Sequence, residues 1–289
     1  MNVLVLGGTG TVGSQVAANL VRRGAGVRVL TRNADAAKRL PASVSVYPGD
    51  LESPDTLVTA FDQADAVFLL NALSPTETAQ GLAAVEAAQK AGVKKIVYLS
   101  VPMPEDSKHI PHFKSKIPIE EAVRQSGAKY TILRPNNFYQ NDYMFRDAIL
   151  GYRIYPQPIG SIGLNRVDAR DIAEAAVNAL LLDGYEGKEY PVIGPDPLTG
   201  ESIASIYTRI FGEEVRYGGD DLDAWFEQAR MVLPEWLARD LKIMYRYFQE
   251  KGLAATERDF ELQREILMRE PISFEAFVAE TAAEWKISR

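Results

Sequence analysis

Three glycines near the start of the chain have the clearest chemical meaning, because Gly7, Gly10 and Gly13 are spaced G-x-x-G-x-x-G. An apolar run leads into them, and the segment 14–24 follows with helical apolar spacing and a final glycine. A helix start carries unpaired N–H groups and a partial positive charge, so it attracts a pyrophosphate, and glycines let the backbone approach closely. The order of strand, turn and helix predicts a dinucleotide site rather than an ordinary turn with spare glycines. The residues expected there are Gly7, Thr9, Gly10, Thr11, Val12 and Gly13.

The end of the second expected strand, 27–30, bears on which dinucleotide is bound. A carboxylate at this point would bond the adenosine ribose of NAD, whereas an arginine would pair with the 2′-phosphate of NADP. The chain has Arg32 and Asn33 here, with Lys38 shortly after. A guanidinium binds phosphate through two parallel hydrogen bonds and stays charged. We therefore expect NADP(H) to be preferred over NAD(H); the alternative is a solvated surface arginine.

Further polar residues follow the next strands, and the carboxyl ends of parallel strands form the ligand crevice in such sheets. Asp50 and Leu51 follow the short strand 43–47, where Asp50 either bonds the adenine edge or acts as a turn or cap aspartate. Asn71 ends a buried strand and Ser100 ends the one after it. We expect Asn71 to lie beside the cofactor.

Two basic residues, His112 and Lys116, lie four positions apart and would share one face of a continuous helix. Pro118 restricts the residue before it and makes that continuity doubtful. With His109, His112 makes the only histidine pair of the sequence, and no cysteine or carboxylate set accompanies the two. We therefore expect no metal site.

The elements that must position these residues alternate between strand and helix through Ser100. That alternation predicts an α/β fold, a doubly wound parallel-sheet Rossmann fold with helices on both faces. We expect residues 1–155 to form an NADP-binding domain, joined by a returning segment at about 164–194. Pro191 marks an edge strand within that segment, and residues 195–289 form a smaller, mainly helical lobe.

Composition excludes several classes of function. Lys and Arg number 32 and Asp and Glu 39, a net charge of −7, and no basic block stands out, so direct nucleic-acid binding is not expected. The sequence shows no apolar run of about 18 residues and no signal-peptide layout at its start, so we expect no membrane span and a cytoplasmic location. Cysteine is absent, which excludes disulfides and thiolate chemistry.

The segment after the strand 130–133 leaves that strand at the crevice end. Here we expect Pro135, Asn136 and Phe138 to line the nicotinamide end of the cofactor site. Tyr139 and Tyr143 are expected near the substrate opening, although aromatic residues at such positions are as often core as pocket.

Taken together, these motifs resemble the NmrA-like family of atypical short-chain dehydrogenases/reductases over nearly the whole chain. The segments that carry the resemblance are 7–13, 31–33, 49–51, 112–116 before Glu120, 131–138, 167–173 and 271–277. The resemblance implies NAD(P) binding and places Lys116 at the nicotinamide ribose. Ordinary short-chain dehydrogenases carry Tyr-x-x-x-Lys and an upstream serine; here Ser100 and Lys116 match two roles, but His112 stands where the tyrosine would be.

Two interpretations follow for this segment. In the catalytic one, His112 or Lys116 donates a proton while hydride leaves the cofactor. In the other, Lys116 only binds ribose hydroxyls and His112 caps or packs. The leading function is an NADPH-dependent reductase, a monomer or homodimer, whose small carbonyl, quinone, imine or conjugated acceptor binds between the lobes. The alternative is a non-catalytic NADPH-sensing regulator of a protein partner; an epimerase-like enzyme ranks low because Tyr-x-x-x-Lys is missing.

Overall fold

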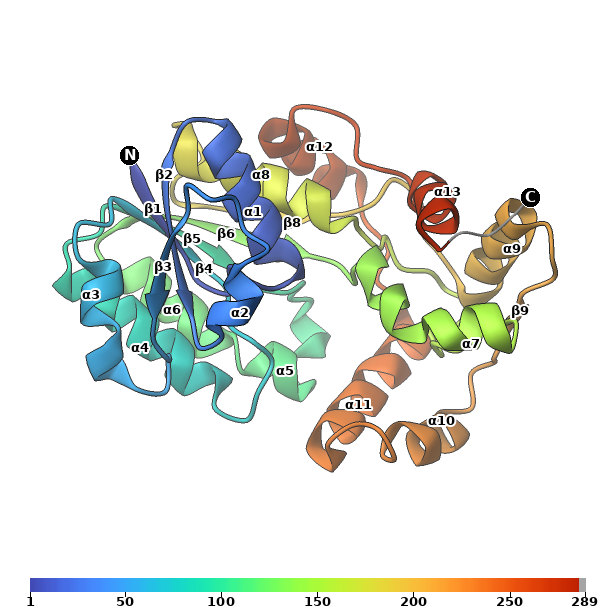
Figure 1. The fold of residues 1–289 in the computed structure, drawn as a ribbon. Coiled ribbons are helices and arrows are strands. Elements are labelled where there is room, and N and C mark those ends of the chain that lie inside the picture. Colours follow the sequence, from blue (N-terminus) through green and yellow to red (C-terminus); the bar gives the residue numbers. More distant parts are fainter. Residues whose placement is uncertain (286–289) are drawn as a thin grey trace.

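A seven-stranded parallel sheet forms the centre of the protein in this computed structural model, which describes residues 1–285 (Figure 1). The strand order is β3-β2-β1-β4-β5-β6-β8, and every neighbouring pair is parallel. The chain order reverses direction between β1 and β4, as in a doubly wound nucleotide-binding sheet. The predicted fold class is therefore confirmed. The strands are β1 (Asn2–Val5), β2 (Gly26–Thr31), β3 (Ser45–Pro48), β4 (Ala66–Leu69), β5 (Lys95–Leu99), β6 (Lys129–Pro135) and β8 (Lys188–Val192).

Helices cover both faces of this sheet because its buried strands present apolar side chains alternately to each side. In β1, Val3 and Val5 pack in one core cluster and Leu4 in the other. The strand β8, which contains Pro191, lies at one edge, where a missing N–H is tolerated. The first face carries α1 (Thr11–Arg22) and α8 (Ala169–Leu181); the second carries α3 (Val58–Phe61), α4 (Glu77–Lys90) and α6 (Ile117–Gln125).

A second lobe lies beside the carboxyl ends of the strands (Figure 1). It has its own aromatic core, in which Tyr155, Tyr207 and Phe248 are almost fully buried. A two-stranded parallel sheet pairs β7 with β9 there. Its elements are η3 (Tyr139–Phe145), α7 (Arg146–Gly151), β7 (Ile154–Tyr155), α9 (Gly200–Phe211), β9 (Arg216–Tyr217), α10 (Leu222–Ala229), α11 (Glu235–Lys251) and α13 (Phe274–Glu284).

Packing crosses the predicted domain boundary at residue 155 in both directions. Ile110 and Phe113, from the stretch of η2 (Glu105–Ser107) and α5 (Pro111–Lys114), lie in the core cluster of the second lobe. Conversely, α12 (Glu257–Leu267) packs on β8 and α8 of the large sheet. The segment that carries His112 therefore packs against the second lobe, although it precedes β6 in sequence.

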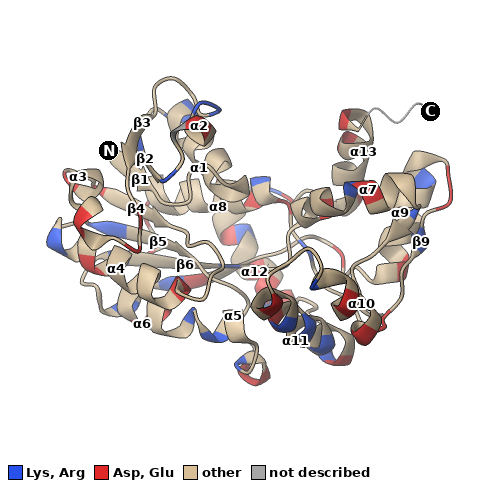
Figure 2. Cartoon of the chain, turned by 60° about the horizontal axis from the view of Figure 1, so that its bottom comes forward, with Lys and Arg blue, Asp and Glu red and all other residues tan. Residues whose placement is uncertain are grey.

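The remaining helices are short, namely α2 (Ala34–Ala37) and η1 (Pro54–Thr56). Acidic and basic side chains are interspersed over both lobes (Figure 2). No helix within residues 1–285 has the length and apolar character needed to cross a bilayer.

Candidate functional site

The glycine turn between β1 and α1 needs glycine at several positions for steric reasons. Gly7 has a φ of +65°, and its carbonyl accepts a hydrogen bond from the Gly10 N–H at 2.9 Å. A Cβ on Gly13 would lie 2.2 Å from that carbonyl oxygen, and a Cβ on Gly8 would lie 2.7 Å from the Val29 side chain. The turn therefore holds its backbone closer to the neighbouring strands than any side chain would permit.

The first turn of α1 presents backbone donors without a competing side chain. Gly10 is the N-cap and offers no side-chain cap, and no acidic residue stands in the first turn. The predicted residues Thr9, Thr11 and Val12 belong to this same turn and helix start, where Val12 is buried in the core. A helix start of this kind suits an anion.

Arg32 lies at the end of β2 and faces the loop after β3. Its Nη1 is 3.8 Å from Oδ2 of Asp50, and its side chain is 67% exposed. The guanidinium is therefore loosely held and free to pair with a phosphate. Leu51, next to Asp50, packs against the core on the α4 face.

The other two residues predicted at this end have local partners. The Asn33 side-chain oxygen accepts the Asp35 N–H at 2.9 Å, so Asn33 is the N-cap of α2. Lys38 pairs with Asp35 at 2.7 Å on the exposed side of the same helix. Neither contact places these side chains on a ligand, so their part in cofactor binding stays a prediction.

Asn71, just after β4, is a buried polar residue whose side chain lacks hydrogen-bond partners among residues 1–285. Its side chain is 5% exposed, and neither amide atom has a hydrogen-bond partner within the described residues. The end of β4 also lies against the glycine turn, since a Cβ on Gly7 would be 3.1 Å from the Leu70 carbonyl oxygen. An unpaired buried amide costs free energy, so Asn71 is well suited to a ligand that supplies both a donor and an acceptor.

Lys116 is held at the start of α4 by a residue that sequence reasoning missed. Its Nζ donates to the Glu77 carboxylate, whose second oxygen accepts from the Ser115 hydroxyl at 2.7 Å. Glu77 is 1% exposed and Lys116 is 7% exposed. An ammonium has three donors, so this pair leaves two for another acceptor. In the sequence, Glu77 looks like an ordinary acidic residue in a first helical turn, which is why no pattern marked it.

Ser100 joins a different polar cluster, also on the α6 face of the sheet. Its hydroxyl donates to Glu120 at 2.6 Å, and Arg134 donates to both oxygens of the same carboxylate, at 3.1 and 2.7 Å. Burial raises the pKa of Glu120, but the hydrogen bonds from Arg134, Ser100 and Arg124 outweigh it and lower that pKa below its ordinary value. Glu120 is therefore a carboxylate, and the Ser100 proton is engaged in holding it.

His112 points the other way from Lys116. Nδ1 of His112 lies 2.6 Å from Oδ1 of Asp240 in α11, and the His112 backbone N–H donates to the same oxygen at 3.4 Å. The helix expected to join His112 to Lys116 is interrupted, because α5 ends at Lys114 and α6 begins with Pro118 in its first turn. The two residues consequently face different lobes.

The residues after β6 lie where that strand meets the second lobe. Pro135 ends the strand, and the Asn136 amide donates to the Leu253 carbonyl at 2.9 Å while its oxygen accepts the Asn137 N–H at 2.7 Å. Phe138 is half-buried and packs against the core on the α1 face. Asn136 therefore ties the end of the sheet to the second lobe, and its contact with a cofactor stays a prediction.

Tyr139 differs from the expectation that it lies near a substrate opening. It is 1% exposed, its ring packs on Phe274 and Phe277, and its hydroxyl donates to the Ile272 carbonyl at 3.3 Å. The reason is that the chain end around α13 folds over it, a contact over more than 130 residues that no local pattern reveals. Tyr143 is 41% exposed and packs its ring on Phe277.

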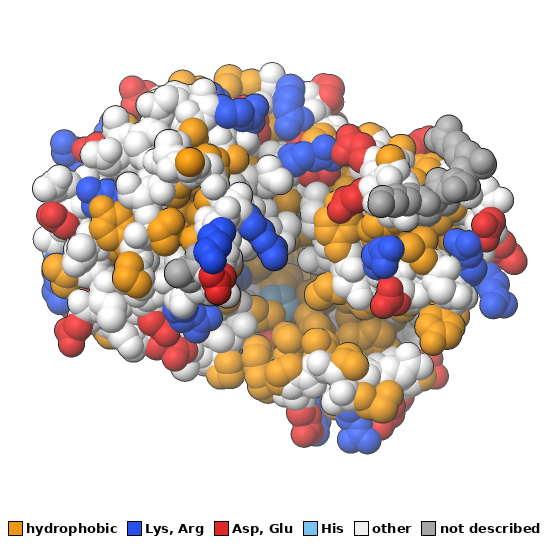
Figure 3. Space-filling view, in the orientation of Figure 1, with side chains coloured by type: hydrophobic (Ala, Val, Ile, Leu, Met, Phe, Trp, Pro, Cys, Tyr) orange, Lys and Arg blue, Asp and Glu red, His pale blue; other side chains and the backbone are white. Residues whose placement is uncertain are grey.

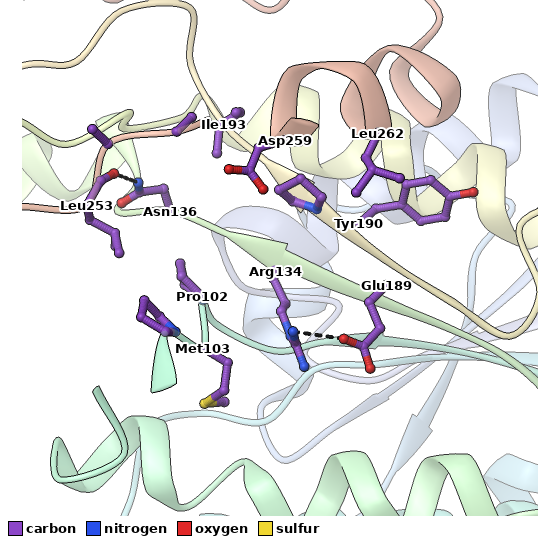
Figure 4. A pocket seen from close by; sticks show the side chains of 14 residues that line it. Pro102, Met103, Arg134, Asn136, Glu189, Tyr190, Ile193, Leu253, Asp259 and Leu262 are labelled. Atoms are coloured by element: carbon purple, nitrogen blue, oxygen red, sulfur yellow. Dashed lines mark hydrogen bonds and ion pairs between the residues drawn. The ribbon is translucent and has the colours of Figure 1, made fainter. Parts of the chain in front are cut away.

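Two hollows lie near these residues. Figure 3 shows one between the lobes, bordered by hydrophobic side chains and with a histidine at its floor. A cavity of about 370 Å³ lies by the edge strand β8, where Arg134 bonds Glu189 and Asp259 stands opposite (Figure 4). Of the residues predicted at the site, only Asn136 lines this cavity. Within residues 1–285, no three histidine, cysteine or carboxylate residues gather as a metal site would require.

Comparison with known proteins decides the family. The family model described as the NmrA-like family matches residues 1–278. The chain belongs to the NmrA-like family. A relative, the NAD(P)H azoreductase of Xenophilus azovorans, is 35% identical over 251 residues, which are 84% of this chain and 86% of that protein. The resemblance seen in the sequence is thus confirmed. Because this relative is a reductase and so similar, the chain is an oxidoreductase.

Two solved structures share the NmrA-like fold over nearly the whole chain. An NADPH-dependent quinone oxidoreductase of Escherichia coli, complexed with NADPH, has a TM-score of 0.85 at 22% identity and covers 96% of this chain and 99% of its own. The negative transcriptional regulator NmrA, in complex with NADP, has a TM-score of 0.81 at 18% identity and covers 99% and 96%. At these identities the likeness extends to the fold alone.

Proposed function

We propose that this protein is an NADPH-dependent reductase of a small carbonyl, quinone, imine or conjugated acceptor bound between the lobes. The observation that carries the proposal is the pairing of two features at the carboxyl ends of the adjacent strands β1 and β4. The tightly packed glycine turn ends in a helix start without a side-chain cap, and the buried Asn71 amide that follows the adjacent strand β4 has no partner within the described residues. Both features fit a dinucleotide, and the azoreductase relative supports its being NAD(P)H.

Individual residues would hold separate parts of that cofactor. The N–H groups after Gly10 suit the pyrophosphate, and the exposed Arg32 guanidinium suits a 2′-phosphate. Lys116, kept in place by Glu77, retains donors for ribose hydroxyls. The bound dinucleotide supplies the hydride; the protein orients and polarises the acceptor.

A proton must reach the acceptor as well, and in this proposal His112 supplies it. Lys116 is engaged with Glu77 and Ser100 with Glu120, whereas one ring nitrogen of His112 has no partner within the described residues. Histidine can give up a proton near neutral pH. In this proposal Lys116 and Ser100 keep supporting positions and His112 acts on the acceptor.

A regulator that senses NADPH without catalysis is the second candidate. The observation in its favour is that both residues matching the catalytic pattern of ordinary short-chain dehydrogenases, Ser100 and Lys116, are committed to buried carboxylates. A fold of the same kind occurs in a transcriptional regulator bound to NADP.

Binding followed by turnover separates the two candidates. NADPH and NADH are titrated by quenching of protein fluorescence, and NADPH oxidation is then followed at 340 nm against quinones, aldehydes, imines and azo dyes. Tighter binding of NADPH with turnover of any acceptor supports the reductase. Tight NADPH binding without turnover across the panel shifts the proposal to the regulator, and absence of binding overturns both.

A further inference from the structure

The segment that carries His112 is docked on one face of α11 in the second lobe. Asp240 and Tyr247 are two turns apart on that helix and share a face. Asp240 contacts the His112 ring, and the Tyr247 hydroxyl donates to Asp106 at 2.8 Å. The apolar residues Ile110 and Phe113 of the same segment are buried in the second-lobe core. The second lobe therefore fixes where this histidine stands.

The contact with Asp240 also fixes which ring nitrogen of His112 carries a proton. A carboxylate only accepts hydrogen bonds, so Nδ1, at 2.6 Å from Oδ1, must be the donor. Asp240 is 4% exposed, and the hydrogen bonds of its side chain within the described residues are both with His112. Neutral His112 consequently has its lone pair on Nε2, and protonated His112 carries its transferable proton there.

Nε2 of His112 is free of protein partners within the described residues and is not fully buried. This nitrogen makes no hydrogen bond within residues 1–285 and keeps some exposed surface, so water reaches it. The His112 side chain as a whole is 10% exposed. Its ring also packs edge-on against Phe113, with centroids 4.8 Å apart, which limits its rotation. The ring is thus held in one orientation while its second nitrogen stays accessible from outside the protein.

We propose that Asp240 is a positioning residue, which holds His112 so that Nε2 gives its proton to the acceptor. The inference rests on the proposed reductase function. The reduction adds a hydride from reduced nicotinamide to the acceptor carbon or nitrogen and a proton to its oxygen or the other nitrogen. The Nε2–H bond breaks as the O–H or N–H bond forms. Neutral His112 keeps its Nδ1 hydrogen bond to Asp240 and regains a proton from water.

This assignment makes the reaction depend on the contact between the lobes. Asp240 lies in α11, more than 120 residues after His112, and no cofactor-binding residue proposed above lies in that helix. Loss of the Asp240 carboxylate should therefore affect proton transfer and leave NADPH binding in place.

Imidazole NMR reads the Asp240 effect without catalysis. The chain has only two histidines, so a ¹⁵N-labelled protein gives two ring systems, and His109→Gln assigns them. We expect the His112 ring to be the Nδ1–H form when neutral, and Asp240→Ala to shift it toward the Nε2–H form, which is favoured in free histidine. Asp223→Asn, an exposed aspartate of neighbouring α10, is the matched control and should leave both rings unchanged. An unchanged ring in Asp240→Ala overturns the positioning.

Kinetics then test whether the position of His112 matters for the reaction. A positioned general acid contributes about 100-fold or more, so Asp240→Ala should lower kcat by about this factor with the KM for NADPH changed less than about twofold. Asp240→Asn, which retains an acceptor oxygen, should lower kcat by a smaller factor than Asp240→Ala. In a His112→Gln background the Asp240→Ala change should have almost no further effect on kcat, because it acts through that ring.

The outcomes separate this inference from the proposed function. If Asp240→Ala lowers kcat equally with and without His112, Asp240 acts only through the stability of the fold. That result overturns the inference and leaves the proposed reductase function intact. NADPH binding without turnover by the unchanged protein overturns the reductase and the proton transfer together. The NMR experiment then still decides whether Asp240 sets the ring.

Discussion

The glycine turn and the segment 111–116 are the two regions on which the proposed chemistry depends, and they are built in opposite ways. The turn is seven consecutive residues whose shape follows from backbone contacts between Gly7, Gly10 and Gly13. In the other region, His112 is fixed by the second lobe and Lys116 by α4, only four residues apart. Local sequence therefore specifies the shape of the glycine turn, whereas the second region exists only where three distant elements meet.

The largest expected effect concerns the tertiary support of Lys116. Lys116→Met leaves the Glu77 carboxylate buried without its cation, which should lower the free energy of unfolding by about 3–5 kcal/mol. Urea unfolding at pH 7 measures it. Lys114→Met, at an exposed position two residues earlier, is the control and should stay within about 0.5 kcal/mol. The double variant Lys116→Met/Glu77→Gln should recover part of the loss; no recovery would show that the pair is not its source.

The next effect tests the local site. In Gly13→Ala the added Cβ would meet the Gly7 carbonyl, so the turn must open, at a cost of about 3 kcal/mol and about 100-fold in NADPH affinity. Gly151→Ala, where a Cβ meets nothing within 4 Å, is the matched control. Fluorescence titration gives the affinities, and the melting temperatures show whether the fold is retained. Equal affinities of the two variants would mean that the turn does not hold the cofactor.

A smaller effect is expected from the exposed cation at the end of β2. Arg32→Ala removes a charge-assisted contact worth about 2 kcal/mol, so NADPH should bind about 30-fold more weakly while NADH is almost unaffected. Arg258→Ala removes an arginine of the same 67% exposure far from the turn and serves as control. Equal losses for both dinucleotides would contradict the phosphate assignment.

The smallest effect tests Ser100 as a support for Glu120. Ser100→Ala should cost about 1 kcal/mol of stability and leave kcat within about threefold; a much larger loss of kcat would assign Ser100 to catalysis. The lowered pKa of Glu120 gives stability that is present above its ordinary value of 4.5 and is lost as pH falls through the lowered value. Without the Ser100 donor the pKa of Glu120 rises. The difference in free energy of unfolding between Ser100→Ala and wild type should therefore narrow below pH 4.5. Exposed Ser53→Ala is the control.

The sequence was most informative where structure is local. Alternating apolar strands and helices predicted the doubly wound sheet, and Pro191 predicted an edge strand. Asp168 directly precedes α8, and its side chain accepts the Arg170 N–H at 2.8 Å as the N-cap of that helix. These features depend on residues a few positions apart, whose geometry follows from helix and strand periods and from cap chemistry.

Long-range partners were beyond sequence reasoning. The second-lobe core buries Arg166 completely, with Nη2 2.8 Å from Asp142, and no periodicity marks either residue. The same holds for Tyr139, which was expected near a substrate opening and is instead packed in a core. Such pairs form because the lobe packed around them removes water from both groups. That packing exists only in the folded chain.

By itself, the sequence determined the parallel sheet, the glycine turn and the family, because each is written in short segments with fixed spacing. Tertiary structure alone decided that Glu77 holds Lys116, that Glu120 engages Ser100 and that Asp240 holds His112. The physical reason is that a side chain's identity gives its chemistry, while the direction it faces and the partner it meets depend on packing between elements far apart in the chain.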